Sequence, residues 1–186
     1  MKTDIEQSWK VLNSEYIYQN PWFTVRREKV ELPNGFVIPE YFVLEYPEWV
    51  NTIAITKDKQ FIFVRQYRHG MGATAFELCA GVCEKEDPSP LVSAQRELLE
   101  ETGYGSGKWT EYMTTSANPS THTNMVHCFL AIDVEKVSEQ NLEPSEDLSV
   151  HLLTLEEVKS LLINDEIKQS VMAAPLWKYI AENHLL

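Results

Sequence analysis

Residues 81–104 read GVCEKEDPSPLVSAQRELLEETGY, and this stretch decides how the rest of the chain is interpreted. Ser89 is a residue type that caps helices, and Pro90 after it is favoured at the first helical position. Gly103 stands where the left-handed residue that ends a helix is expected. The pattern therefore predicts a helix from Pro90 to about Thr102.

Three glutamates gather on one turn of this predicted helix. Because residues three and four apart share a helix face, Glu97, Glu100 and Glu101 cluster together. Like charges at this spacing repel one another unless a cation compensates them. A solvated acidic surface is the common explanation for a bare run of glutamates, but oxygen ligands are also what Mg²⁺ or Mn²⁺ requires. The turn is therefore a candidate metal site.

Strand patterns stand on both sides of this helix. Segments rich in aromatic and β-branched residues, separated by turn residues, predict strands at 9–18, 23–32, 36–46, 50–56, 60–66, 75–80, 110–115, 125–134 and 149–153. Two further helices are predicted at 154–163 and 170–182. The order of strands, helix, strands and two helices predicts an α/β (α+β) fold, in which helices pack on the faces of a mixed sheet. We expect residues 1–48 to form a β-rich section, a small subdomain or dimer arm, and residues 49–186 to form the main domain.

The chain is acidic and of single-domain size. Its 186 residues carry 28 Asp and Glu against 16 Lys and Arg, which gives a net charge of −12. This charge argues against binding to nucleic acid or to an anionic membrane. No run of 18 apolar residues predicts a transmembrane helix. The odd count of three cysteines and the lack of an N-terminal apolar signal predict a cytoplasmic location.

The stretch at 81–104 resembles the Nudix box, whose pattern is G-x5-E-x7-R-E-U-x-E-E-x-G-U with U a bulky aliphatic residue. Its second half matches at Arg96, Glu97, Leu98, Glu100, Glu101 and Gly103. Tyr104 replaces the last aliphatic residue. The first half is one residue longer than the pattern, so the mid-box glutamate corresponds to Asp87 or to Glu86. The resemblance implies that residues 49–186 form a Nudix α/β/α sandwich with a mixed β-sheet and a metal-binding loop–helix–loop.

Further matches resemble the ADP-ribose and nucleoside-diphosphate-sugar pyrophosphatase branch of this family. Residues 77–81, ELCAG, look like the E-x-x-A-G segment that leads into the box in this branch, and residues 64–68, VRQYR, look like its V-x-Q-Y/F-R strand. Pro119 matches a proline that follows the box in members that hydrolyse ADP-ribose. Asn124 departs from the branch, because a glutamate is usual at that position.

The resemblance also implies roles for individual residues. The implied metal ligands are the Ala80 carbonyl and the carboxylates of Glu97, Glu100 and Glu101. The implied catalytic residues are Glu100, Glu101 and Glu146, with Glu146 as a general base or a further ligand. The implied substrate-binding residues are Arg68, Glu77 and Pro119. The residues expected to shape the site are Gly81, Arg96 and Gly103, with Arg96 paired to Glu77.

The activity implied by this resemblance is hydrolysis of the pyrophosphate bond of a nucleoside diphosphate sugar, with Mg²⁺ or Mn²⁺ as cofactor. ADP-ribose would give AMP and ribose 5-phosphate. Two alternatives stay open: another substrate, such as a GDP-sugar, NADH or a dinucleoside polyphosphate, and a non-catalytic ligand-sensing Nudix domain. The retained box glutamates favour the enzyme. The expected partners are the small-molecule substrate and a second copy of the chain, with neither nucleic acid nor membrane.

Overall fold

The computed structural model describes residues 7–186, and these fall into two compact units. The first unit contains the residues up to Pro47 together with Asn118–Asn124. The second unit contains Glu48–Ala117 and Met125–Leu186. The chain thus leaves the second unit after Ala117 and returns to it at Met125, an excursion that the strand and helix patterns do not predict.

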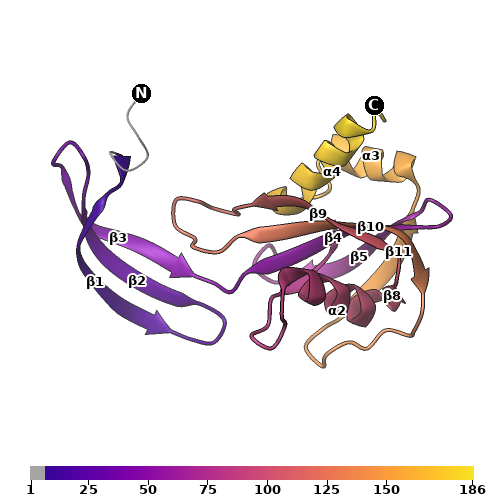
Figure 1. The fold of residues 1–186 in the computed structure, drawn as a ribbon, viewed down its shortest axis with the longest axis horizontal. Helices are drawn as coiled ribbons and strands as arrows, with labels where there is room; N and C mark the ends of the chain where they lie inside the picture. Colours follow the sequence, from indigo (N-terminus) through magenta and orange to yellow (C-terminus); the bar gives the residue numbers. More distant parts are fainter. Residues whose placement is uncertain (1–6) are drawn as a thin grey trace. The chain divides into compact units, whose positions relative to one another are not determined.

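The first unit is an antiparallel meander of β1 (Lys10–Gln19), β2 (Thr24–Glu31) and β3 (Val37–Glu45) (Figure 1). The segment 118–124 runs beside the end of β3. The Leu44 N–H donates to the Thr121 carbonyl at 2.7 Å, and the Thr123 N–H donates to the Leu44 carbonyl at 3.1 Å. Backbone hydrogen bonds therefore explain why this distant segment belongs to the first unit.

A mixed sheet forms the centre of the second unit. Its strands are β4 Trp49–Thr56, β5 Phe61–Arg68, β6 Ala73–Glu77, β7 Cys79–Val82, β8 Tyr104–Gly105, β9 Lys108–Thr115, β10 Val126–Lys136 and β11 Leu148–Leu153. Their order is β11-β5-β4-β10-β8, while β6, β7 and β9 pair with β5, β4 and β10. β4 and β10 are parallel, and the other pairs are antiparallel. The strand predicted at 75–80 is wrong as a single element, because β6 and β7 pair with different neighbours, and β8 was not predicted.

Helices cover both faces of this sheet (Figure 1). Helix α2 (Pro90–Thr102) covers one face, and α3 (Leu155–Ile163) and α4 (Ser170–Glu182) cover the other. Because successive side chains of a strand point to opposite faces, Ile53 of β4 packs in the core with α3 and α4, while Ala54 packs with Leu98 of α2. The predicted α/β/α sandwich is confirmed.

Helix α2 ends where the sequence predicts. Gly103 has a φ of +73°, and its N–H donates to the Leu99 carbonyl. A Cβ at this position would lie 2.3 Å from the Ser138 carbonyl oxygen, so the position requires glycine for its conformation and for its space. Ser89 has the extended backbone of an N-cap, but its side chain makes no capping hydrogen bond. Across residues 7–186, no helix is both long and apolar enough to span a membrane.

Candidate metal centre

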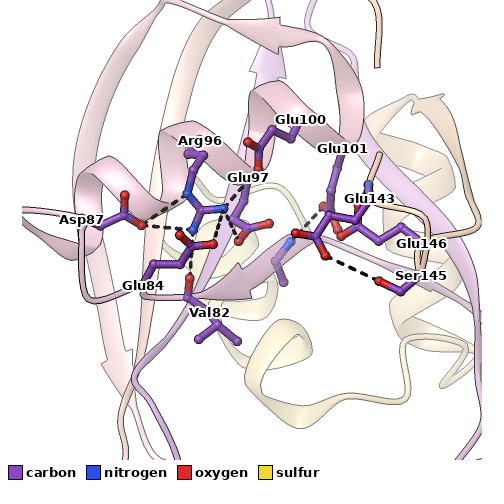
Figure 2. Close-up of polar contacts among 11 residues, drawn as sticks. Val82, Glu84, Asp87, Arg96, Glu97, Glu100, Glu101, Glu143, Ser145 and Glu146 are labelled. Atoms are coloured by element: carbon purple, nitrogen blue, oxygen red, sulfur yellow. Dashed lines mark hydrogen bonds and ion pairs between the residues drawn. The ribbon is translucent and has the colours of Figure 1, made fainter. Parts of the chain in front are cut away.

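Three carboxylates converge beside the C-terminal half of α2. Glu97 and Glu101 come from α2, and Glu146 comes from the loop that leads into β11 (Figure 2). One carboxylate oxygen of each residue lies within 4.8 Å of those of the other two. Glu97 and Glu101 are one helical turn apart, which places them on the same face. The structure therefore brings together three of the carboxylates that the sequence singles out.

Glu101 is the most buried member of this group. Its residue is 3% exposed, and one carboxylate oxygen accepts a hydrogen bond from the Ala80 N–H at 3.2 Å. Within residues 7–186, no lysine or arginine forms an ion pair with it. Burial without a counter-cation raises the pKa of Glu101 to about 8. The centre is thus a place where a positive charge would stabilise the ionised carboxylate.

Gly81 leaves room for the second carboxylate. A Cβ at position 81 would lie 2.0 Å from the Glu97 carboxyl carbon, a separation that no pair of real atoms tolerates. Burial raises the pKa of Glu97, and its neighbour Arg96 opposes this shift. Glycine at the beginning of the box therefore lets the backbone of β7 lie close to the Glu97 carboxylate, which any larger residue would displace.

Arg96 holds the loop before α2 against the helix. Its guanidinium donates to Asp87 at 3.0 Å, to the Val82 carbonyl at 3.1 Å, to Glu97 at 2.9 Å and to Glu100 at 3.1 Å (Figure 2). Asp87 is thus the closer of two loop carboxylates that pair with the box arginine, the other being Glu84 at 3.7 Å.

The expected pair between Arg96 and Glu77 is wrong. Arg96 is occupied by carboxylates of its own loop and helix, whereas Glu77 pairs with Arg68. Arg68 Nε donates to Glu77 at 2.9 Å, and a terminal nitrogen donates to the second oxygen at 2.5 Å. Gln66 adds a third donor at 3.2 Å. The buried Glu77 carboxylate is thus compensated within the protein.

Three other predicted site residues have different surroundings. Glu100 lies outside the group of converging carboxylates, because its side chain turns toward Arg96. The Ala80 backbone lies beside Glu101, as its N–H bond shows. Pro119 is exposed in the segment that belongs to the first unit. The ligand roles of Glu100 and Ala80 and the substrate role of Pro119 stay predictions.

A cavity of about 480 Å³ borders the metal centre along β7. Ala80, Gly81 and Val82 line it together with Arg68 and the first residues of α4. Asn51 also lines the cavity, is 1% exposed and donates to the Val171 carbonyl at 3.0 Å. Sequence reasoning missed Asn51, although an amide inside the otherwise apolar strand pattern of β4 was a signal.

The donor set of this centre fits a hard divalent cation. Its three converging groups are carboxylates, and Mg²⁺ and Mn²⁺ prefer oxygen ligands. The uncompensated, buried Glu101 distinguishes the group from an ordinary acidic surface, because an exposed carboxylate would be stabilised by water. Glu97 and Glu101 are placed to hold such an ion, and Glu146 lies close enough to be a further ligand or a general base.

Two family models match the chain. The nucleoside diphosphate sugar hydrolase N-terminal domain matches residues 9–44, and the NUDIX domain matches residues 47–174. An ADP-ribose pyrophosphatase from Bacillus subtilis (strain 168) is 33% identical over 159 residues, which cover 85% of each chain. A methanol dehydrogenase activator from Bacillus methanolicus is 30% identical over 87% of this chain and 86% of its own length.

A solved structure shares the fold. The crystal structure of an ADP compounds hydrolase superposes with a TM-score of 0.79, covering 95% of this chain and 96% of that one, at 24% sequence identity. The NUDIX domain match spans well over half of the chain and contains α2, the Arg96 network and the three converging carboxylates. The chain is therefore a member of the Nudix family.

Proposed function

We propose that this Nudix chain is a divalent-metal-dependent hydrolase that cleaves the pyrophosphate bond of a nucleoside diphosphate sugar. The observation that carries the proposal is the convergence of Glu97, Glu101 and Glu146 within 4.8 Å. The match to a nucleoside diphosphate sugar hydrolase N-terminal domain and the similarity to an ADP-ribose pyrophosphatase support the substrate class. ADP-ribose, hydrolysed to AMP and ribose 5-phosphate, is the proposed substrate.

The position of each residue suggests its role in the proposed reaction. Bound Mg²⁺ or Mn²⁺ supplies neutralisation of phosphate charge and a lowered pKa for the attacking water. In this proposal Glu97, Glu101 and the Ala80 carbonyl hold the ion. Glu146 lies on a loop and accepts a proton from the water as general base. Glu100 becomes a ligand only if its carboxylate leaves Arg96.

The cavity beside β7 is the proposed place for part of the substrate. Arg68 lines it and presents a guanidinium whose remaining donors suit phosphate oxygens, although Glu77 already takes two of its hydrogen bonds. We propose that Arg68 contacts the pyrophosphate and that Glu77 fixes its orientation. Pro119 stays a predicted substrate-binding residue in the same proposal.

Hydrolysis of a substrate panel tests this function. The panel contains ADP-ribose, ADP-glucose, GDP-mannose, NADH and diadenosine polyphosphates, each with Mg²⁺ and with Mn²⁺, and the products are separated by chromatography. We expect selective release of AMP and ribose 5-phosphate from ADP-ribose. Preference for another member of the panel would support pyrophosphate hydrolysis and would contradict ADP-ribose as the substrate. A flat panel would overturn the enzyme proposal, and calorimetry with Mn²⁺ would then show whether a sensor domain still binds metal.

We further propose a homodimer in which residues 1–48 form the dimer arm. The described part of this segment exposes many large apolar side chains: Trp9, Val11, Leu12, Tyr16, Ile17, Tyr18, Trp22, Phe36, Val37 and Phe42. Apolar surface on this scale commonly marks an interaction site. Light scattering at tens of micromolar is expected to give twice the chain mass of 21.5 kDa. The monomer mass would contradict the proposal.

A matched pair of variants locates the dimer interface. Trp22 is 72% exposed in the first unit, and Ile163 is 63% exposed at the end of α3 in the second. Trp22→Glu should shift the chain toward monomer, whereas Ile163→Glu should leave the mass unchanged. Equal effects of the two substitutions would place the interface elsewhere.

The cysteines support the cytoplasm as the proposed compartment. Cys79, Cys83 and Cys128 are all free, and Cys79 and Cys128 are buried. Burial raises the pKa of the Cys79 thiol and raises that of Cys128 to about 12, so both stay protonated and unreactive at neutral pH. Buried free thiols are typical of proteins from reducing compartments.

A further inference from the structure

One short segment, Lys136–Asn141, caps the C-terminal end of α2. The last carbonyls of a helix have no partner within the helix, so other groups must satisfy them. Here the Asn141 N–H donates to the Glu100 carbonyl at 2.9 Å, and the Lys136 ammonium donates to the Thr102 carbonyl at 3.1 Å. We call these six residues the capping segment.

Gln140 makes a hydrogen bond to Glu101, one of the three converging carboxylate residues. Its side-chain Nε2 donates to the Glu101 carbonyl at 2.7 Å, which is the shortest of these contacts. The backbone of Glu101 is thus held by Gln140, while its carboxylate is held by the Ala80 N–H. The capping segment therefore contacts the residue whose side chain forms the most buried part of the metal centre.

The same segment begins the loop that carries Glu146. Residues 142–147 connect Asn141, which is bonded to α2, with Leu148, which pairs with Gln66 in the sheet. Inside this connection the Glu146 carboxylate accepts the Glu143 N–H at 2.9 Å, and the Glu146 N–H donates to the Glu143 carbonyl at 2.9 Å (Figure 2). The connection is therefore a small turn fixed at both ends.

We propose that Gln140 is a positioning residue that sets the place of Glu146 relative to Glu101. The front of the loop is held by two bonds to α2, from the Gln140 side chain to the Glu101 carbonyl and from the Asn141 N–H to the Glu100 carbonyl, and the back is fixed by β11. Loss of the Gln140 bond leaves the Asn141 bond as the remaining attachment of the front to Glu100 and Glu101, which loosens the front and lets Glu146 move away from the other two carboxylates. This inference rests on the proposed function for its kinetic consequence, but not for its structural one.

Hydrogen exchange tests the structural part without any activity. Gln140→Met keeps the length of the side chain and removes the donor. We expect faster amide exchange in residues 142–147 of this variant, with α2 still protected. Gln140→Lys retains a donor that suits a helix C-terminus and should restore protection. Gln95→Met, the same change at an exposed position of α2, is the matched control and should leave the loop unchanged.

A double-mutant cycle tests the kinetic part. One neutral hydrogen bond corresponds to about a three- to tenfold effect, so Gln140→Met should lower kcat by that factor with little change in KM. If Gln140 acts through Glu146, the same substitution should have no further effect in a Glu146→Gln background. Equal losses of kcat in both backgrounds, or unchanged exchange in residues 142–147, would overturn the inference. Failure of the wild type to hydrolyse any substrate would instead overturn the proposed function and leave the exchange result to decide the positioning role.

Discussion

Two buried glutamates of the same unit have opposite surroundings. Glu77 is 1% exposed and Glu101 is 3% exposed, so both carboxylates are almost completely removed from water. Arg68 and Gln66 together supply donors to both oxygens of Glu77. Glu101 accepts from the Ala80 N–H and interacts with the Cys79 thiol, but among the residues described no lysine or arginine forms an ion pair with it.

This difference distinguishes Glu77, a carboxylate neutralised within the protein, from Glu101, a carboxylate that a bound cation would stabilise. Burying a charge is costly unless it is paired, and the protein itself pairs Glu77. The shifted pKa of Glu101 shows that its ionised form is not compensated in the same way. A site that keeps such a carboxylate beside two others gains stability when a divalent cation binds. The comparison makes four predictions, from the largest expected effect to the smallest.

Removal of the Glu101 charge should cause the largest loss of activity. Glu101→Gln keeps the shape of the side chain and removes a ligand charge, so turnover of the substrate should fall by about a hundredfold or more. Circular dichroism should show that the fold survives. Glu100→Gln is the control from the same helical turn. Because the Glu100 carboxylate faces Arg96, the loss of turnover in this variant should be much smaller. Wild-type turnover in Glu101→Gln would contradict the assignment of Glu101 to the metal centre.

The second prediction concerns the stability of the metal-free protein across pH. A glutamate carboxyl ordinarily has a pKa of 4.5, and burial raises the pKa of Glu101 to about 8 in the fold, so the folded state keeps a proton that the unfolded state loses between these pH values. The free energy of unfolding should therefore fall as pH rises from about 4.5 to 8, by on the order of 5 kcal/mol from this group.

Denaturant unfolding in the presence of a chelator measures this effect. Because other groups also titrate in this range, the informative quantity is the difference between the wild type and Glu101→Gln at each pH. The variant should gain relative stability as pH rises. A difference that is constant from pH 5 to pH 8 would mean that Glu101 is ionised in the metal-free fold.

Local patterns made much of this architecture predictable. The helix with Pro90 at its start and Gly103 at its end has the bounds that its residues indicate, because capping is decided by neighbours in sequence. The spacing of Glu97 and Glu101 placed them on one face for the same reason. These features depend on contacts within a few residues, which is why a single sequence contains them.

Long-range pairing was not predictable in the same way. Glu77 was the predicted partner of Arg96, but several carboxylates compete for each arginine, and only the fold shows that Arg96 pairs with Asp87, Glu97 and Glu100 instead. The bond from Gln140 to the Glu101 carbonyl joins residues of different elements and leaves no periodic signal. The excursion at 118–124 is likewise fixed by hydrogen bonds to a distant strand.

The third prediction is that substitution of Glu77 changes the free energy of unfolding in the opposite direction from substitution of Glu101. Glu77→Gln removes the carboxylate that compensates Arg68 and should destabilise the metal-free protein by about 2 kcal/mol; the value is at the lower end for buried pairs because the Arg68 side chain is 36% exposed. Glu101→Gln should instead stabilise the metal-free protein at pH 8. Urea unfolding of the two variants side by side measures both. Changes of the same sign would mean that the two glutamates do not differ in compensation.

The smallest effect is expected at Gly81, where no charge changes. Gly81→Ala would place a Cβ 2.0 Å from the Glu97 carboxyl carbon, so the carboxylate must move away from the backbone of β7. Because metal ligation depends on the positions of all three carboxylates, affinity for Mn²⁺ in calorimetry should weaken by about tenfold. Gly70→Ala is the matched control, since a Cβ at position 70 meets nothing within 4 Å. If both substitutions leave the Mn²⁺ affinity unchanged, the close approach of β7 to Glu97 does not set the geometry of the centre. If only Gly81→Ala weakens the affinity, β7 determines the position of Glu97 as well as donating a hydrogen bond to Glu101.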